Sequence, residues 1–146
     1  MIDYFYITDL FKYPPDEYVQ YAEEMISLYE DADWWNDEVD TSATLARIIT
    51  GSHIFMVARD SRTKEIIGLG RIISDRVTDA YVQDITVRKD YRGQGIAKEI
   101  LKRLVEKAKL AGLPRLLLIA ERGTANLYKH VGFEECETDV SMELNL

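Results

Sequence analysis

The stretch YRGQGIAKEIL, residues 91–101, places a cation and two glycines immediately before an amphipathic helix pattern. Gly93 and Gly95 let the backbone approach a ligand closely, because glycine has no Cβ atom. A helix N-terminus presents unpaired N–H groups and a partial positive charge, and both favour a phosphate. Arg92 adds a fixed charge with planar donors. We therefore predict a phosphate or pyrophosphate cradle; the alternative is a tight strand-to-helix turn that merely requires glycine.

Residue types exclude several other chemistries. A P-loop ends in Gly-Lys-Ser/Thr, whereas two apolar residues follow Gly95. A dinucleotide fingerprint needs a third glycine where this chain has Lys98. The G-x-S-x-G elbow of a serine hydrolase is missing from the sequence. His53, His130 and Cys136 do not form a recognisable set of metal ligands, so no metal is expected.

The 146 residues fit one domain, and their charge is unevenly distributed. The formal net charge is −8, and residues 1–50 hold 12 acidic residues against 2 basic ones. Residues 88–109 hold 8 basic and 3 acidic residues, which is either a solvated helix face or a positive field beside the cradle. The acidic total argues against a nucleic-acid partner. We expect a cytoplasmic protein with no membrane contact, because the sequence has one cysteine, no secretory signal and no membrane-spanning apolar run.

Hydrophobic periodicity predicts the elements that position the cradle. Strands are expected where apolar residues alternate or run together, and helices where they recur every three to four residues. The expected strands span 3–10, 53–60, 65–74, 80–87, 115–120 and 136–144, and the expected helices span 16–32, 40–52, 95–111 and 124–131. Strand, helix and strand over 80–120 form a βαβ crossover, which is nearly always right-handed. The sequence therefore predicts one α/β domain with a mixed sheet.

Residues 82–108, VQDITVRKDYRGQGIAKEILKRLVEKA, resemble the acyl-CoA-binding motif of the GNAT N-acyltransferase superfamily. The family pattern is Arg/Gln-x-x-Gly-x-Gly/Ala, and Arg92, Gly95 and Ala97 match it. As in the family, the motif follows an apolar strand and opens a long helix.

A second resemblance lies in ERGTANLYKHVGF, residues 121–133. This family often ends in Asn-x-x-Ala-x-x-(aromatic or Leu)-Tyr-x-x-x-Gly-Phe, and the matching residues are Leu127, Tyr128, Gly132 and Phe133. Glu121 and Thr124 replace the Asn and Ala, so the usual asparagine contact to the pantetheine arm is missing. The order of the earlier elements also agrees, and the whole chain resembles a small single-domain bacterial or archaeal member.

The resemblance implies a single GNAT-like α/β (α+β) domain over residues 1–146, with a mixed sheet of six to seven strands and about four helices. In this family two parallel strands splay apart, and acetyl-CoA lies between them. The residues implied in binding it are Ile85, Thr86, Val87, Arg92, Gly93, Gln94, Gly95, Ile96, Ala97, Lys98 and Tyr128. Backbone groups at Ile85 and Val87 would bond the pantetheine amides and the thioester carbonyl, with Val87 N–H polarising that carbonyl.

Two side chains are candidates for proton transfer. Tyr128 resembles the family's general acid, and its phenol pKa of ~10 lies above a thiol's ~8.5, so it could protonate the departing CoA thiolate. The alternative is a helix tyrosine packed in the core. Asp84 is the candidate base for the acceptor amine, because a charge inside an apolar strand is costly unless exposed or paired. A salt bridge or a solvated strand face would explain Asp84 equally well; Gln83 and Glu121 are weaker candidates, and water is a further one.

The segment YEDADWWNDEVD, residues 29–40, indicates how an acceptor would be recognised. In the family, the region around the first two helices shapes the acceptor pocket. Acidic residues with Trp34 and Trp35 would suit a cationic amine through charge and cation–π contact. The alternative is a solvated acidic loop with one tryptophan anchored in the core.

Together these features predict an N-acetyltransferase that moves an acetyl group from acetyl-CoA to a primary amine by direct transfer in a ternary complex. A non-catalytic acyl-CoA-binding or sensor module is the alternative, and Tyr128 argues against it. A toxin-type acyltransferase acting on charged transfer RNA is disfavoured by the acidic surface. The expected partners are acetyl-CoA and the acceptor; the acceptor's identity and a homodimeric state stay open.

Overall fold

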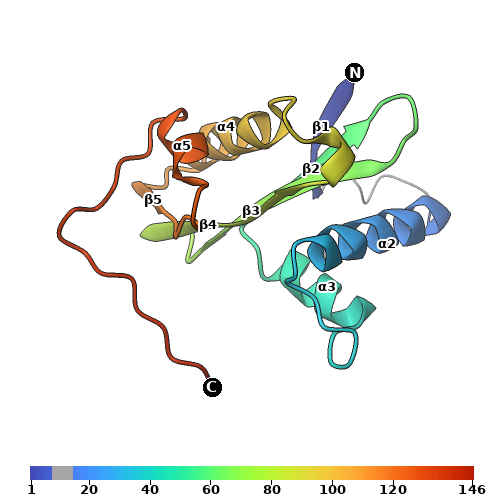
Figure 1. Cartoon of the computed structure of the whole chain (residues 1–146), viewed down its shortest axis with the longest axis horizontal. Helices are drawn as coiled ribbons and strands as arrows, with labels where there is room; N and C mark the ends of the chain where they lie inside the picture. Colours follow the sequence, from blue (N-terminus) through green and yellow to red (C-terminus); the bar gives the residue numbers. More distant parts are fainter. Residues whose placement is uncertain (8–14) are drawn as a thin grey trace.

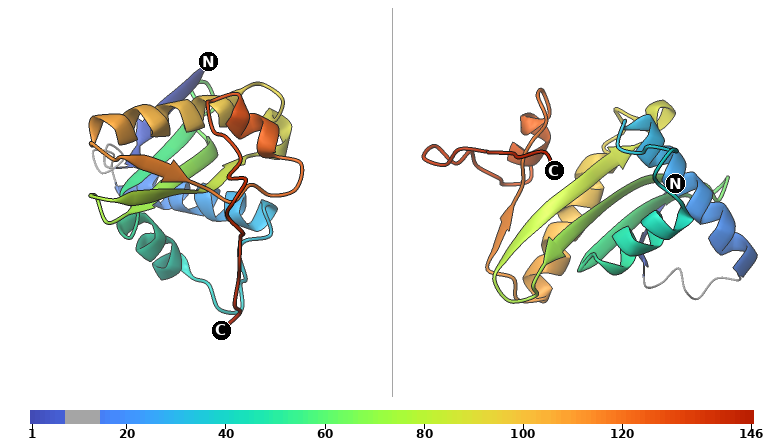
Figure 2. Two further views of the ribbon diagram at one scale, coloured as in Figure 1. Left: turned by 90° about the vertical axis from the view of Figure 1, so that its left-hand side faces the viewer. Right: turned by 90° about the horizontal axis from the view of Figure 1, so that it is seen from below.

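A mixed sheet lies between two layers of helices. The computed structural model describes residues 1–7 and 15–146. Its strands, in their order across the sheet, are β1 (Ile2–Tyr6), β2 (Ile54–Asp60), β3 (Ile66–Ser74), β4 (Asp79–Val87) and β5 (Arg115–Leu117). Its helices are α2 (Pro15–Asp31), α3 (Ser42–Thr50), α4 (Ile96–Leu110) and α5 (Ala125–Lys129), with a 3-10 turn η1 (Lys89–Tyr91). Figures 1 and 2 show α2 and α3 on one face of the sheet and α4 on the other.

The connectivity follows the predicted order. Strands β1 to β4 pair antiparallel, and β5 pairs parallel to β4 after the crossover through α4. The strands predicted over 53–60, 65–74 and 80–87 and the four predicted helices are confirmed. The first strand ends at Tyr6, and residues 8–10 of its predicted range lie outside the described residues. None of the helices described is long and apolar enough to cross a bilayer.

The strand predicted over 136–144 is wrong. Residues 134–146 have no regular structure and make no backbone hydrogen bond within the described chain. The described sheet therefore has five strands, not six to seven. An alternating sequence becomes a strand only where a neighbouring strand pairs with its N–H and C=O groups, and none of the strands that the structure describes does so here.

Each face of the sheet has its own core. Because side chains alternate between the faces of a strand, the fully buried strand β2 contributes to both. Met56 and Ala58 pack under α4, whereas Phe55 and Val57 pack under α2 and α3. Burying one such large apolar side chain contributes about 1.5–3 kcal/mol, so the two clusters hold both helical layers to the sheet.

Helix α4 is amphipathic, and a glycine lies just outside each end. Its buried residues recur at helical spacing and are Ile96, Ile100, Leu101, Leu104 and Ala108. Gly112 has a φ of 78° at its C-terminal end, and the N–H groups of Gly112 and Leu113 bond carbonyl oxygens of the last turn. Glycine adopts this left-handed closing conformation without a Cβ penalty. The other glycine, Gly95, caps the N-terminus that faces the candidate site.

A β-bulge reverses the side-chain alternation of β4. Asp84 and Ile85 together stand opposite the single residue Gly70 of β3, and Asp84 has a φ of 57°. Before the bulge the even-numbered residues of β4 pack under α4, and after it the odd-numbered residues do. Asp84 therefore points to the α2 face rather than into the α4 core. A Cβ at position 70 would lie 2.5 Å from Ile85 Cδ1 and 2.9 Å from Ile100 Cγ2, so a larger residue there would have to displace these side chains.

Candidate active site

A cleft opens where the parallel strands β4 and β5 part. Their pairing covers only Asp79–Tyr81 of β4 and Arg115–Leu117 of β5. Beyond these pairs, a cleft of about 790 Å³ is lined by the rest of β4, the N-terminus of α4, residues 118–121 and α5. This volume lies within the range of ~300–1,000 Å³ that small-molecule sites occupy.

The edge of β4 that faces this cleft keeps backbone groups without a strand partner. The N–H of Arg88 donates to the carbonyl of Ile67 in β3 at 2.8 Å. Because N–H groups alternate between the two edges of a strand, Val87 N–H points to the cleft. The Val87 carbonyl on the same edge accepts a hydrogen bond from Arg92 Nε at 2.9 Å. An extended ligand that contains amides can therefore pair with this edge in place of a strand.

The N-terminus of α4 supplies a row of donors at one end of the cleft. The backbone N–H groups of residues 93–98 have no acceptor within the described chain. Gly93 and Gly95 have φ values of 76° and 80°, and a Cβ built on either would meet no atom within 4 Å. The space in front of them is therefore open to a ligand. With Arg92 and Lys98 in the same wall, these donors form a concavity whose N–H groups and positive charges suit an anion.

Most of the predicted cofactor-binding residues line this cleft. They are Ile85, Thr86, Val87, Arg92, Gly93, Gly95, Ile96, Ala97, Lys98 and Tyr128. Gln94 is exposed and does not line it. Glu121 and Gln83 also lie in the wall.

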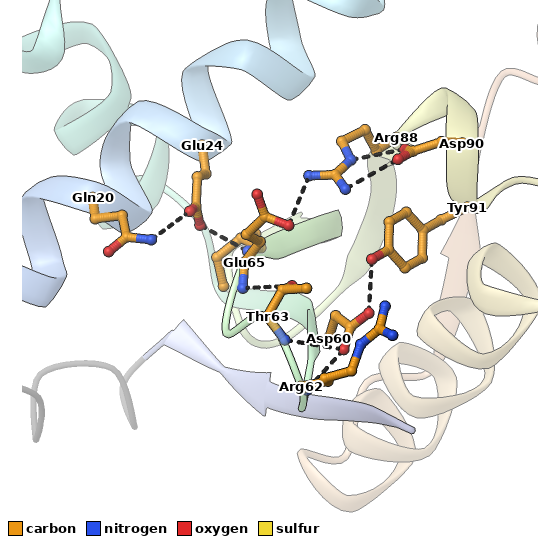
Figure 3. Close-up of polar contacts among 10 residues, drawn as sticks. Gln20, Glu24, Asp60, Arg62, Thr63, Glu65, Arg88, Asp90 and Tyr91 are labelled. Carbon is orange, nitrogen blue, oxygen red and sulfur yellow. Dashed lines mark hydrogen bonds and ion pairs between the residues drawn. The ribbon is translucent and has the colours of Figure 1, made fainter.

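A hydrogen-bond network, drawn in Figure 3, joins the turn η1 to the β2–β3 hairpin. Tyr91 donates its hydroxyl to Asp60 Oδ2 at 2.7 Å, and Arg88 bridges Asp90 and Glu65. Asp60 also accepts two backbone N–H groups of the β2–β3 turn. The Tyr91 hydroxyl, followed by these N–H groups, lowers the pKa of Asp60 to about 2. The network ties a distant hairpin to the cradle, and sequence reasoning missed it because its members are far apart in the chain.

Tyr128 lies on α5 in the wall of the cleft. Its ring contacts Phe133 edge-on, with centroids 6.1 Å apart, and its hydroxyl has no hydrogen-bond partner within the described chain. Burial and then the nearby Glu121 carboxylate raise the pKa of Tyr128. The phenol therefore remains protonated at neutral pH and can donate a proton to a group in the cleft.

Asp84 also lines the cleft, and one of its oxygens is already engaged. Its Oδ2 atom pairs with Arg71 Nε and accepts the Tyr29 hydroxyl at 2.9 Å. The side chains of Asp84 and Arg71 are 18% and 13% exposed. Oδ1 has no partner within the described chain, so it remains available to a group in the cleft. The salt bridge left open as an alternative is thus present, and it coexists with a usable oxygen.

Sequence reasoning missed both partners of Asp84. Tyr29 lies 55 positions earlier, on the helix α2 that covers the sheet face to which Asp84 points, and no spacing rule connects the two. Burial and then the Asp84 carboxylate raise the pKa of Tyr29, which therefore stays a donor. The sequence did contain one sign of the bulge at Asp84, namely the run GLGR, residues 68–71. Glycines inside a strand mark a bulge or a close backbone approach.

The two tryptophans of the predicted acceptor site have different environments. Trp34 lines the cleft, is 38% exposed and meets Tyr29 edge-on, with ring centroids 6.2 Å apart. Trp35 packs against the core under α2 and α3 and does not line the cleft. Asp31 lies in the same wall as Trp34. The cleft thus contains one of the two tryptophans beside an acid, and the second tryptophan is part of the core, as the alternative expected.

With this fold and this site, the chain belongs to the acetyltransferase (GNAT) family, whose pattern matches residues 8–133. It is similar to YycN, an uncharacterized N-acetyltransferase of Bacillus subtilis, with 32% identity over 136 residues that cover 86% of this chain and 85% of that protein. The chain spans less than half the length of the first curated relatives that it matches.

Solved structures share the fold. The protein of unknown function SA2161 from methicillin-resistant Staphylococcus aureus superposes with a TM-score of 0.77 at 22% identity, with all of both chains covered. A predicted acetyltransferase from Clostridium acetobutylicum, solved with acetyl-CoA, has a TM-score of 0.68 at 18% identity and covers 98% of this chain and 96% of that one. At these identities the likeness concerns the fold alone.

Proposed function

We propose that this chain is an acetyl-CoA-dependent N-acetyltransferase acting on a primary amine. The observation that carries the proposal is the row of unpaired N–H groups at residues 93–98, which opens onto a cleft between two parted strands. A pyrophosphate fits these donors, and Arg92 and Lys98 add charge beside it. Membership of a family that uses acetyl-CoA supports the same reading.

The pantetheine arm would then run along the edge of β4, away from the cradle. Val87 comes first along this path, so its N–H would meet a pantetheine amide. Ile85 N–H points to the same edge, because it lies two residues earlier after the bulge. The thioester carbonyl would lie near Ile85, which assigns the polarising N–H to this residue rather than to Val87. A backbone donor placed where the oxyanion develops stabilises the transition state.

The transfer is a direct nucleophilic substitution. The neutral amine attacks the thioester carbon, a C–N bond forms, the C–S bond breaks, and CoA leaves as a thiolate that Tyr128 protonates. A lysine-like amine with a pKa near ~10 is only about one part in a thousand neutral at pH 7, so a base is needed. Asp84 Oδ1 would take the amine proton directly or through a water. Proton exchange with solvent returns both side chains to their starting states.

A cationic amine suits the end of the cleft opposite the cradle. Asp31 and Asp84 line it together with Trp34, whose ring face can hold a cation. The acidic N-terminal third of the chain adds an attractive field for such an acceptor. Polyamine-like amines, arylalkylamines, lysine side chains and protein N-termini all meet this requirement.

Release of free CoA thiol from acetyl-CoA tests the proposal across a panel of acceptors. The panel would contain a diamine, an arylalkylamine, a lysine-containing peptide and a peptide with only a free N-terminus. We expect thiol release that requires an amine, with the acetylated amine identified by mass spectrometry. If acetyl-CoA raises the melting temperature but no amine elicits release, the chain is instead a non-catalytic acyl-CoA-binding module.

A further inference from the structure

Tyr29 is a buried residue of α2 whose side chain contacts two groups of the candidate site. It is 2% exposed and belongs to the core cluster under α2 and α3. Its hydroxyl donates to Asp84 Oδ2 at 2.9 Å, and its ring meets the Trp34 ring edge-on, with centroids 6.2 Å apart. Tyr29 does not itself line the cleft, so it acts on the cleft only through these neighbours.

The carboxylate of Asp84 is held at one oxygen by two donors from different elements. Arg71 of β3 and Tyr29 of α2 both donate to Oδ2, whereas Oδ1 has no partner within the described chain. Two donors on one oxygen fix the rotation of the carboxylate and decide which oxygen faces the cleft. Asp84 also has a φ of 57°, a left-handed conformation that a residue with a Cβ adopts at a steric cost. The two donors therefore also help to hold the bulge.

Arg71 is anchored without help from Tyr29. Its Nη1 atom donates to Ser52 Oγ at 3.3 Å, and Ser52 Oγ donates to the carbonyl of Ile48 in α3 at 2.6 Å. The ion pair of Arg71 with Asp84 should therefore survive the loss of the Tyr29 hydroxyl. What that hydroxyl adds is the second contact, without which the carboxylate can turn about its one remaining donor.

We propose that Tyr29 is a positioning residue for the acceptor side: its hydroxyl turns Asp84 Oδ1 toward the amine, and its ring sets the place of Trp34. Because one rigid side chain contacts both residues, it fixes the spacing between the proton acceptor and the aromatic face that receives the amine. The inference rests on the proposed function, in which Asp84 takes the amine proton and Trp34 contacts the cation.

Tyr29→Phe tests the hydroxyl, because it keeps the ring and both of its tryptophan contacts. The value of kcat should fall by up to about 10²-fold, the loss that a misplacement of about 1 Å causes. The KM for the amine and the Kd for acetyl-CoA should change little. The deficit in kcat should shrink as the pH approaches the amine pKa of ~10, where a base is no longer needed. Burial and then Asp84 raise the pKa of Tyr29, so its own titration does not enter this range.

Tyr29→Leu tests the ring, because it removes the edge contact with Trp34 as well as the hydroxyl. Beyond the loss in kcat, the KM for the amine should rise by about 2–5-fold, which corresponds to the affinity that an exposed cation–π contact contributes. Steady-state kinetics at varied amine concentration separates the two effects. A KM that is the same in the Phe and Leu variants shows that the ring does not place Trp34 and overturns that half of the proposal.

Tyr21→Phe is the matched control, because Tyr21 is a buried tyrosine of the same helix and core cluster whose hydroxyl bonds Arg59 instead. It should lower the melting temperature about as much as Tyr29→Phe and leave kcat unchanged. In an Asp84→Asn background, Tyr29→Phe should cause no further loss of kcat, because no base is left to position.

Two different failures are distinguishable. A wild type that turns over, with additive losses for Tyr29→Phe and Asp84→Asn, overturns the positioning role alone. A kcat in Tyr29→Phe equal to that of the wild type, or an equal loss in Tyr21→Phe, does the same. A wild type that releases no thiol with any amine refutes the proposed function instead, and the positioning role with it.

Discussion

Tyr128 is the side chain on which proton delivery to the leaving thiolate would depend. Its hydroxyl has no hydrogen-bond partner among the described residues, and burial with the nearby Glu121 raises its pKa, so the acid form predominates at neutral pH. Tyr128→Phe keeps the ring and its contact with Phe133, so the melting temperature should change little. The value of kcat should fall by about 10²–10⁴-fold with little change in acetyl-CoA affinity. Steady-state kinetics beside a melting curve of the same preparation measures both, and an unchanged kcat removes Tyr128 from the mechanism.

Asp84 poses a different question, because its carboxylate is both paired and available. If Oδ1 removes the amine proton, Asp84→Asn should lower kcat most at neutral pH, where little of the amine is neutral. The deficit relative to wild type should then shrink as the pH approaches the amine pKa of ~10, since the base is no longer needed. A role limited to holding Arg71 and Tyr29 predicts a deficit that is constant across this range. The pH profile of kcat for the two proteins decides between these outcomes.

At the residue scale, the sequence predicted what is local and missed what is distant. The cradle residues from Arg92 to Lys98 are contiguous, so glycine placement and helix polarity sufficed to predict them. The pairs Tyr29–Asp84 and Asp60–Tyr91 join separate elements, and only the folded sheet brings them together. The different environments of Trp34 and Trp35 likewise depend on packing that neighbouring identical residue types cannot reveal.

Helix α4 allows a matched comparison, because a left-handed glycine lies at each end. Gly95 and Gly112 have φ values of 80° and 78°, and a Cβ on either would meet no atom within 4 Å. Each Gly→Ala substitution should therefore cost a similar ~1–2 kcal/mol of conformational strain. Only Gly95→Ala places a methyl group in front of the donor row, so only this variant should lose acetyl-CoA binding. Calorimetric titration of both variants measures the affinities; equal affinities would show that the cradle lies elsewhere.

The β2–β3 hairpin should be sensitive to acid through Asp60. Its folded pKa of about 2 lies below the usual 3.8, so its contribution to stability is present above pH 4 and is lost as the pH falls toward 2. Tyr91→Phe removes the largest cause of that shift and should raise the pKa of Asp60 toward 3.8. Asp75 is the control, because its pKa is also about 2 but is lowered by Thr78 and its neighbours. Carboxyl NMR titration should show Asp60 move in Tyr91→Phe while Asp75 does not; an unmoved Asp60 contradicts the network.

At the scale of helices and strands, the period of the hydrophobic pattern predicted well whether an element exists and poorly where it ends. Strands β2 to β4 carry strong patterns and pair on both edges, and helix α4 packs against all three of them, so pattern and structure agree. The run 115–120 was predicted as one strand, but pairing with β4 ends at Leu117 because the bulge bends β4 away. Residues 136–144 do alternate, yet a strand also needs a partner, and none of the described strands pairs with them.

Binding of acetyl-CoA should stabilise the whole folded molecule. A ligand that binds only the folded state raises apparent stability by RT ln(1 + [L]/Kd), or about 2.7 kcal/mol at a hundredfold excess over Kd. Acetyl-CoA at millimolar concentration should therefore raise the melting temperature, and CoA should do so as well because the pyrophosphate is common to both. Acetate alone should have no effect. No shift with either CoA compound would refute binding at the cradle.

Only three residue pairs join β5 to β4, and this short pairing affects the order in which parts of the molecule unfold locally. Strands β1 to β4 share long ladders, whereas the backbone after Leu117 is tied to the sheet at one end only. Local opening is cheapest where such ties are few, so among the hydrogen-bonded elements β5 and α5 form the unit that unfolds first and exchanges its amide hydrogens soonest. Acetyl-CoA bound between both walls of the cleft would join this unit to the rest of the fold. The cooperatively folded unit of the protein would then include acetyl-CoA itself, which is consumed at every turnover.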